Sequence, residues 1–261
     1  MPLDNSIFRA PAKEMLPYLS ICSEGKERQG KTHFAYSAPG PIGAIVLDRN
    51  NENVAIKAQR EGRDIRIADF TQGKWVAPLV GKPNANFHIE RWKAIHDACL
   101  MLANDKQIRS IVIDTGTQLY EDIRMAMLGK LVQVMPHQYG PVNDAMRSLI
   151  QTLNTSGKHI IITHKIDKEY KNDKWDGKSY ERKGWKDMSF QCQMALRHEC
   201  EMLREQQDDG SVNVRPQFLT RIIDCNQNPM LKGMELLDDN STFLEVALLV
   251  YPEADPSLFV D

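Results

Sequence analysis

The segment GKERQGKT, at residues 25–32, constrains this sequence more than any other feature. It matches the pattern G-x-x-x-x-G-K-[ST] at every fixed position. Glycines let a backbone turn tightly, so that successive N–H groups point inward and form a nest for an anion. A helix that begins at such a nest directs the positive end of its dipole at the same anion. The segment therefore predicts a phosphate-binding loop.

The two residues that end the segment indicate which phosphate compound is expected. Lys31 supplies a positive charge for the β- and γ-phosphates of a nucleoside triphosphate, and Thr32 supplies an oxygen ligand for Mg²⁺. The sequence thus predicts ATP and Mg²⁺ as cofactors. A chance match in a surface loop is the alternative, but the segment follows an apolar run and opens a helical stretch, as the motif requires. The predicted nucleotide-binding residues are Gly25, Lys26, Glu27, Arg28, Gln29, Gly30, Lys31, Thr32 and His33.

Short apolar runs alternate with longer amphipathic segments along the chain. This alternation is typical of an α/β fold, in which a mostly parallel sheet is flanked by helices. The last part of the chain instead predicts antiparallel C-terminal strands with a turn at residues 208–210, and residues 243–251 fit either a helix or a strand. The expected strands are residues 18–22, 42–47, 65–68, 111–113, 159–163, 194–203 and 218–224, and the expected helices are residues 89–104, 118–132 and 142–155.

Length and charge limit the classes of protein that fit. The 261 residues suit a single domain, with a core at residues 16–235, an insertion at residues 165–186 and a C-terminal extension at residues 236–261. A formal net charge of −2 gives no general attraction for nucleic acid, so any DNA contact needs a local basic patch. No apolar stretch approaches the roughly 20 residues that cross a bilayer, and no signal peptide is evident. We therefore expect a cytoplasmic protein without a membrane partner.

A second carboxylate is expected beside the phosphate loop, because sites of this kind hold the Mg²⁺ shell with an acid at the end of an apolar strand. Asp114 directly follows the apolar residues 111–113. An aspartate at a strand end is common on its own. Downstream of a phosphate loop, it is favoured as the second metal residue with Thr32, binding Mg²⁺ directly or through a water molecule.

Several segments together resemble one family. GKERQGKT, SAPGPIGAIVLD, IRSIVIDTGTQ, YGPVNDAMRSLIQTL, HIIITHK and RIIDCNQNPMLKG are similar to phage RecA-like nucleotide-binding proteins, often called phage AAA domain proteins. Some members are ATPases of single-strand annealing recombination. The resemblance covers about residues 16–235 and implies a RecA-like P-loop NTPase core that handles single-stranded DNA at the expense of ATP. It also implies a ring or filament of identical subunits, a phage single-strand binding protein as a partner, and the host cytoplasm as location.

The resemblance also points to candidate catalytic residues. RecA-like ATPases carry the water-activating carboxylate after the strand that follows the phosphate-loop helix, where this chain has Asn50. Asp48 and Glu52 are the nearest candidate bases. The alternative for Asp48 is a residue that caps the strand end and helps to position Mg²⁺. His164 occupies the place of a residue that senses the γ-phosphate, although an ordinary hydrogen-bonded histidine also fits. Lys232 and Arg221 match the basic residue that reaches the ATP of a neighbouring subunit.

Residues 165–186 read KIDKEYKNDKWDGKSYERKGWK and interleave aromatic rings with cations. Single-stranded nucleic acids bind to surfaces of this kind, because rings stack on bases and cations pair with phosphates. The alternative is a solvated β-hairpin that turns at residues 176–177, with acids among its lysines. Both hold if the hairpin also binds DNA. The candidate DNA-binding residues are Lys168, Tyr170, Lys171, Lys174, Trp175, Lys178, Tyr180, Arg182, Lys183 and Trp185.

Two other functions are compatible with a phosphate loop. A small-molecule or nucleotide kinase uses the same loop, but such enzymes close an arginine-rich lid over the donor. The insertion here has Arg182 as its one arginine, which disfavours a kinase. A loader or assembly module that binds ATP and hydrolyses it poorly is the third possibility, and the amide at Asn50 favours it.

Overall fold

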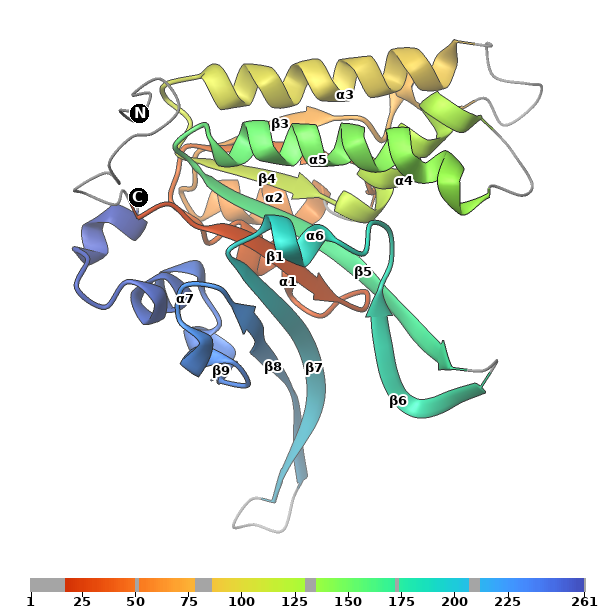
Figure 1. Ribbon diagram of the computed structural model, residues 1–261. Coiled ribbons are helices and arrows are strands. Elements are labelled where there is room, and N and C mark those ends of the chain that lie inside the picture. Colours follow the sequence, from red (N-terminus) through yellow and green to blue (C-terminus); the bar gives the residue numbers. More distant parts are fainter. Residues whose placement is uncertain are drawn as a thin grey trace, which may run out of the picture.

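The computed structural model describes residues 17–49, 52–77, 86–129, 135–171, 174–206 and 212–260. These residues form one nine-stranded sheet in the order β3-β2-β4-β5-β1-β7-β8-β9, with β6 paired to β5 (Figure 1). The predicted α/β class, with a mostly parallel sheet, flanking helices and antiparallel C-terminal strands, is confirmed. None of the helices in the described segments is long and apolar enough to cross a membrane.

Six neighbouring strands of the sheet run parallel, from the edge strand β3 to β7. Three of them, β1, β2 and β4, are buried along their whole length, as parallel strands covered by helices require. The parallel strands are β1 (Ser20–Gly25), β2 (Ile42–Val46), β3 (Ile65–Asp69), β4 (Ser110–Asp114), β5 (His159–Lys171) and β7 (Met194–Gln206).

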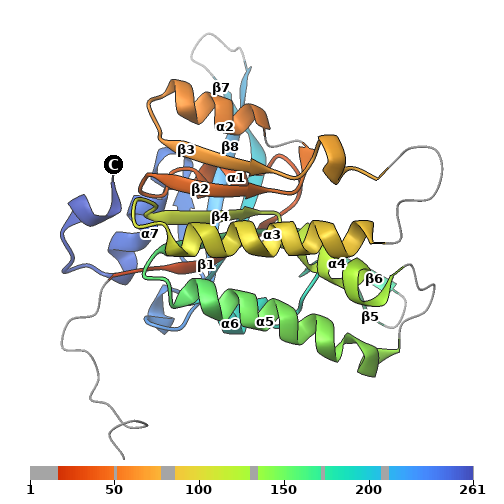
Figure 2. The same cartoon turned by 90° about the horizontal axis from the view of Figure 1, so that it is seen from above.

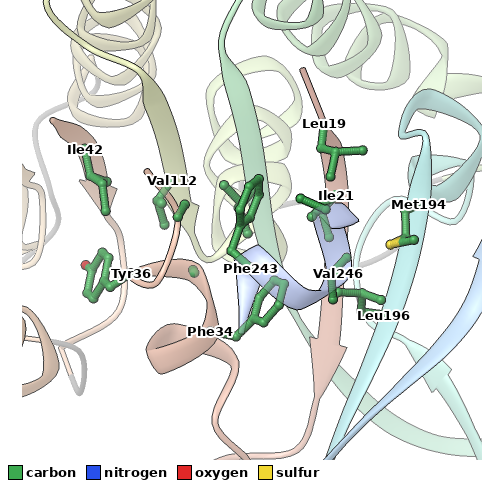
Figure 3. Close-up of a cluster of buried hydrophobic side chains, with 14 of the residues drawn as sticks. Leu19, Ile21, Phe34, Tyr36, Ile42, Val112, Met194, Leu196, Phe243 and Val246 are labelled. Carbon is green, nitrogen blue, oxygen red and sulfur yellow. The ribbon is translucent and has the colours of Figure 1, made fainter. Parts of the chain in front are cut away.

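Helices cover the two faces of this sheet (Figures 1 and 2). On one face, α3 (Phe87–Asn104), α4 (Gly116–Leu128) and α5 (Gly140–Asn154) bury apolar side chains with the short helix α6 (Met188–Gln191). On the other face lie α1 (Lys31–Ala35), α2 (Glu52–Arg60) and α7 (Phe243–Val250). Figure 3 shows Phe34 of α1 and Phe243 of α7 facing each other in this second cluster, with ring centroids 6.4 Å apart.

Residues 243–251, whose sequence pattern fitted either a helix or a strand, contain the helix α7. Thr242 caps the helix, because its hydroxyl accepts a hydrogen bond from the Glu245 N–H at 3.4 Å. Val246, Ala247 and Val250 then face the sheet and are buried. The segment is therefore a helix whose apolar side packs on the sheet.

Two antiparallel arms extend past the carboxyl ends of the parallel strands (Figure 1). The first joins the end of β5 to β6 (Lys174–Arg182), and the second joins β7 to β8 (Val212–Cys225), beside which lies β9 (Glu235–Leu237). The predicted turn at residues 208–210 lies outside the described residues. Between the two arms, β1 ends at Gly25 and the predicted phosphate loop begins.

The first arm is the expected β-hairpin, but its predicted turn is wrong. Asp176 and Gly177 lie inside β6, and Lys171 of β5 pairs with Lys174. Asp176 does form a local turn, because its Oδ1 accepts the N–H groups of Lys178 and Ser179 at 2.8 and 2.6 Å. That turn coincides with a shift in the β5–β6 register, so it makes a bulge in the strand.

Candidate nucleotide site

The phosphate loop connects the end of β1 to the start of α1, in the place that the motif requires. Gly30 has a φ angle of 86°, and a Cβ atom there would meet the ring of Phe218 at 3.3 Å. A Cβ atom on Gly25 would meet the backbone oxygen of His198 at 2.7 Å. Both positions therefore need glycine. Gln29 closes the loop, because its side-chain oxygen accepts the N–H of Lys26 at 2.8 Å.

The side chain of Lys31 lies back across this loop. Its ammonium group donates to the backbone oxygen of Lys26, and the residue is 8% exposed. Burial lowers the pKa of Lys31, and the charge of Asp114 partly opposes that shift. The ammonium is thus held inside the loop, where the motif places the phosphates.

Thr32 and Asp114 come together as a pair of oxygen donors. The Thr32 hydroxyl donates to Asp114 Oδ2 at 2.8 Å, and the Thr163 hydroxyl donates to Oδ1 of the same carboxylate. Burial raises the pKa of Asp114, while the bonds from Thr163 and Thr32 and the charge of Lys31 lower it. Hydroxyl and carboxylate oxygens beside a phosphate loop fit Mg²⁺, which takes one or two protein ligands with phosphate oxygens and water. These two residues would hold the metal that shields the triphosphate charge.

Asp48 lies at the same end of the sheet but is engaged in an ion pair. Its Oδ2 is 2.6 Å from the ammonium of Lys165, the last residue of β5 that pairs with β1. The N–H of Leu47 donates to the Asp114 backbone oxygen at 2.7 Å, which keeps Asp48 beside the metal residue. Asn50 and the side chain of Glu52 lie outside the described residues, so the second candidate base stays a prediction.

His164 does not face the phosphate loop. Neighbouring residues of a strand point to opposite faces, and Thr163 takes the loop side. The His164 ring packs beside Gly116, where a Cβ atom would meet it at 2.6 Å. Burial and the charge of Arg182 lower its pKa to about 3, so the ring is neutral at pH 7. This placement argues against the predicted γ-phosphate sensor and puts Thr163 in that position, which the sequence pattern did not single out.

The hairpin contacts the phosphate loop and the strand that leads into it. The ammonium of Lys26 lies over the ring of Tyr180, 3.9 Å from its centroid. Glu24, which directly precedes the loop, accepts Arg182 Nε at 2.9 Å and Arg197 Nε at 3.0 Å. Its carboxylate is 4% exposed. The β6 strand is thereby fastened to β1 and to the loop by two independent contacts.

The hairpin carries part of the predicted aromatic and basic surface. The ammonium of Lys168 lies 4.4 Å from the centroid of Trp175, which meets Tyr180 edge to face at 5.7 Å. Tyr170 pairs with Trp175 across the strands and is 60% exposed. The side chains of Lys174, Lys178 and Lys183 are exposed, whereas nothing is described of the Lys171 side chain.

Two residues assigned to the DNA surface from sequence do not belong to it. Trp185 is 3% exposed and packs in the cluster under α4 and α5, with the Arg147 guanidinium 5.7 Å from its ring. Arg182 is used by the ion pair with Glu24, and its side chain is 10% exposed. The strand β6 ends at Arg182, so Trp185 lies past the hairpin, and the interleaved composition does not reveal that boundary.

The two candidates for a cation that acts on a neighbouring subunit lie on the β8–β9 side. Arg221 pairs with Glu235 at 2.8 Å and with Glu199 at 3.8 Å. Lys232 is exposed after the short turn Pro229–Leu231. Their action on a second subunit stays a prediction.

Comparison with known proteins agrees with this geometry. A family model described as an AAA domain matches residues 18–203, which is more than half of the chain and includes the loop, Asp114 and the hairpin. A comparison with curated protein sequences found no match. The phosphate loop, the Thr32–Asp114 pair and the parallel sheet are the features expected of P-loop nucleoside triphosphatases. The chain therefore belongs to the AAA domain family.

Proposed function

We propose that this protein is a RecA-like ATPase that acts on single-stranded DNA in phage recombination or replication, by annealing or strand handling. Family membership implies ATP binding and hydrolysis. The DNA-directed role, the assembly of subunits into a ring or filament, and a phage single-strand binding protein as partner are the further parts of the proposal.

The observation that carries the DNA-directed part is the contact between the hairpin and the phosphate loop. Rings and lysines that suit single strands occur on the same strand as Tyr180, whose ring contacts Lys26 of the loop. A strand of DNA bound along Tyr170 and Trp175 would alter the hairpin, and the Arg182–Glu24 pair would transmit that change to the start of the loop. This arrangement supports hydrolysis that depends on DNA.

The nucleotide part is tested by replacing Lys31. The change Lys31→Ala removes the charge expected to bind the β- and γ-phosphates, and charged hydrogen bonds contribute about 1.5–3 kcal/mol each. Binding of Mg-ATP should therefore weaken by roughly tenfold to a hundredfold or more. Lys106→Ala removes an exposed lysine elsewhere and should bind as the wild type does. Thermal unfolding of both variants checks that the fold is kept.

The DNA part is tested by an ATPase assay with single- and double-stranded oligonucleotides, together with a sizing measurement. Single strands should raise the rate in the wild type. Tyr170→Ala with Trp175→Ala should lower single-strand affinity at least about tenfold, since stacking contributes about 1–3 kcal/mol per base. The matched control is Phe190→Ala, which removes a ring that is 80% exposed on α6. The proposal fails if the rate ignores DNA and the double variant binds single strands as the wild type does.

An ATP-binding loader with weak hydrolysis is the second candidate, and the Asp48–Lys165 pair favours it. The Asp48 oxygen that lies 2.6 Å from the Lys165 ammonium is occupied by that ion pair and is not free to hold the attacking water. A hydrolysis rate that stays near the background with and without DNA, alongside tight ATP binding, would support this candidate over the first.

A further inference from the structure

We propose that Lys165 is a second phosphate-binding residue of the nucleotide site, whose ammonium group exchanges the Asp48 carboxylate for the γ-phosphate of ATP. This inference rests on the proposed ATP binding at residues 25–32. It assigns a ligand contact to a residue outside the phosphate-loop motif.

The register of the sheet places Lys165 at the loop. Lys165 pairs with Gly25, the residue at which β1 ends and the loop begins. Thr163, two residues earlier on the same face of β5, donates its hydroxyl hydrogen bond to Asp114. The side chain of Lys165 therefore lies on the same face of the sheet as Thr32 and Asp114, two residues beyond Thr163 along β5.

The ion pair shows the path that the Lys165 side chain takes. Asp48 follows β2, and β4 lies between β2 and β5 in the sheet. To reach Asp48 Oδ2 at 2.6 Å, the Lys165 side chain crosses the carboxyl end of β4, where Asp114 lies. The Lys31 ammonium is bonded to Lys26 of the same loop, so the two lysines serve the same end of the sheet.

Two ammonium groups at one phosphate loop favour the binding of an anion of high charge. Asp114 and Asp48 partly supply that charge, but Asp114 accepts hydrogen bonds from Thr32 and Thr163 and is the residue assigned to the metal. The γ-phosphate is the most highly charged group of ATP and lies beside the metal residues in P-loop sites. Lys165 is therefore placed to bind a terminal phosphate, while a β-phosphate stays with the loop and Lys31.

The Asp48–Lys165 pair is suited to exchange. The two side chains are 22% and 36% exposed, so water reaches both. Partly exposed ion pairs of this kind contribute little to stability. A phosphate oxygen can replace the carboxylate at small cost, and the exchange releases Asp48, the candidate base, only when a γ-phosphate is present.

The test compares ATP with ADP, because the second lacks the γ-phosphate. Equilibrium binding of a non-hydrolysable ATP analogue and of ADP is measured with Mg²⁺ for the wild type, for Lys165→Gln and for Lys186→Gln. Lys186 is the matched control, since it is an exposed lysine in an ion pair with Glu181 at 3.2 Å. We expect Lys165→Gln to bind the ATP analogue about tenfold more weakly or worse, the loss that follows one charge-assisted hydrogen bond, and to bind ADP normally.

The outcomes separate this inference from the function on which it rests. Loss of both nucleotides in equal measure, or of neither, in a folded Lys165→Gln variant overturns the role of Lys165. A wild type that binds neither nucleotide instead contradicts ATP binding itself. Asp48→Asn gives an independent check, because it frees Lys165 without removing it: affinity for the ATP analogue should be kept or rise, and a fall would contradict the exchange.

Discussion

The hydroxyl of Thr32 and the carboxylate of Asp114 lie 2.8 Å apart although 82 positions separate them in the sequence. The phosphate loop supplies the first and the end of β4 supplies the second. A parallel sheet brings the carboxyl ends of its strands to one edge, and ligand sites of α/β proteins form there. The metal pair is thus a direct product of the strand order β4-β5-β1.

The first prediction concerns the energetic cost of that metal site. Burial raises the pKa of Asp114 in the folded protein above its value in the unfolded chain. The free energy of unfolding therefore falls as pH rises from the unfolded pKa to the folded pKa. Below the unfolded pKa the carboxyl is protonated in both states, and this loss of stability is absent. Asp114→Asn should therefore raise the melting temperature of the nucleotide-free protein at pH 7 by roughly 2–4 °C, the shift that about 1 kcal/mol produces in a chain of this size.

The same variant should lose function. The amide that replaces the carboxylate in Asp114→Asn cannot supply an anionic oxygen to Mg²⁺, so the dependence of ATP affinity on Mg²⁺ should disappear while the fold is more stable. Thermal unfolding and nucleotide titrations with and without Mg²⁺ measure both effects. A variant that melts below the wild type at pH 7 and above it at about pH 3.5, below the usual aspartate pKa, would show that the pH argument has the wrong sign.

The second prediction concerns the histidine under the loop. His198 is buried between Ser23 and Thr220, with ring nitrogens 2.8 and 2.9 Å from their hydroxyls. Burial and the charge of Lys31 lower its pKa to about 3. The unfolded chain binds this proton near pH 6.5, so stability falls as pH decreases from 6.5 toward 3, by about 1.4 kcal/mol per pH unit at most.

Urea unfolding between pH 7.5 and 4.5 measures that slope. His164 and His159, whose pKa values burial lowers to about 3 and about 4, add to it in the same direction. His198→Gln keeps an acceptor and a donor between the two hydroxyls and should reduce the slope by about one proton. An unchanged slope in a variant that folds would mean that His198 is not neutral in the native protein.

The loop motif and the strand ends could be read from the sequence because each depends on local spacing. Gly25, Lys31 and Thr32 follow one pattern, and Asp114 follows an apolar run. The Glu24–Arg182 pair could not be found in this way. It depends on the register of β1 against β5 and of β5 against β6, which no local pattern encodes.

The errors in the hairpin have related causes. Asp176–Gly177 is a strong turn signal, and it did produce a turn, but inside a strand whose ends were fixed by pairing with β5. Trp185 is an aromatic residue among lysines, as a DNA-binding residue would be. It is buried, however, because the strand ends at Arg182 and the chain beyond it packs against the core. The contacts of Thr163 with Asp114 and of Lys165 with Asp48 were missed, because they depend on which face of β5 the two side chains take.

A third prediction tests the buried contact between the hairpin and β1. Glu24→Gln leaves the guanidinium groups of Arg182 and Arg197 without a buried counter-charge. Removing one partner of such a pair costs about 3–5 kcal/mol. The matched surface pair is Lys183–Asp167, whose side chains are 59% and 60% exposed. Asp167→Asn should change stability by less than about 1 kcal/mol.

Urea unfolding compares these two variants directly. If the hairpin is fastened to the loop through Glu24, Glu24→Gln should also weaken the stimulation of ATP hydrolysis by single-stranded DNA, whereas Asp167→Asn should not. Equal stability losses in the two variants would mean that the Glu24 network is as weak as a surface pair.

The fourth prediction separates backbone strain from the nucleotide site. Gly30 and Gly62 have positive φ angles of 86° and 93°, so alanine costs roughly 1–2 kcal/mol of stability at either position. A Cβ atom on Gly62 meets nothing within 4 Å, whereas one on Gly30 meets the Phe218 ring at 3.3 Å. Gly30→Ala should therefore distort the loop as well as strain it, and ATP affinity should fall about tenfold or more, while Gly62→Ala binds ATP normally.

Phe218→Ala in the Gly30→Ala background removes the ring but leaves the φ strain, so stability should recover only in part. If Gly62→Ala weakened ATP binding equally, the loss would come from general destabilisation, and the close approach of Phe218 to the loop would have no role in its shape.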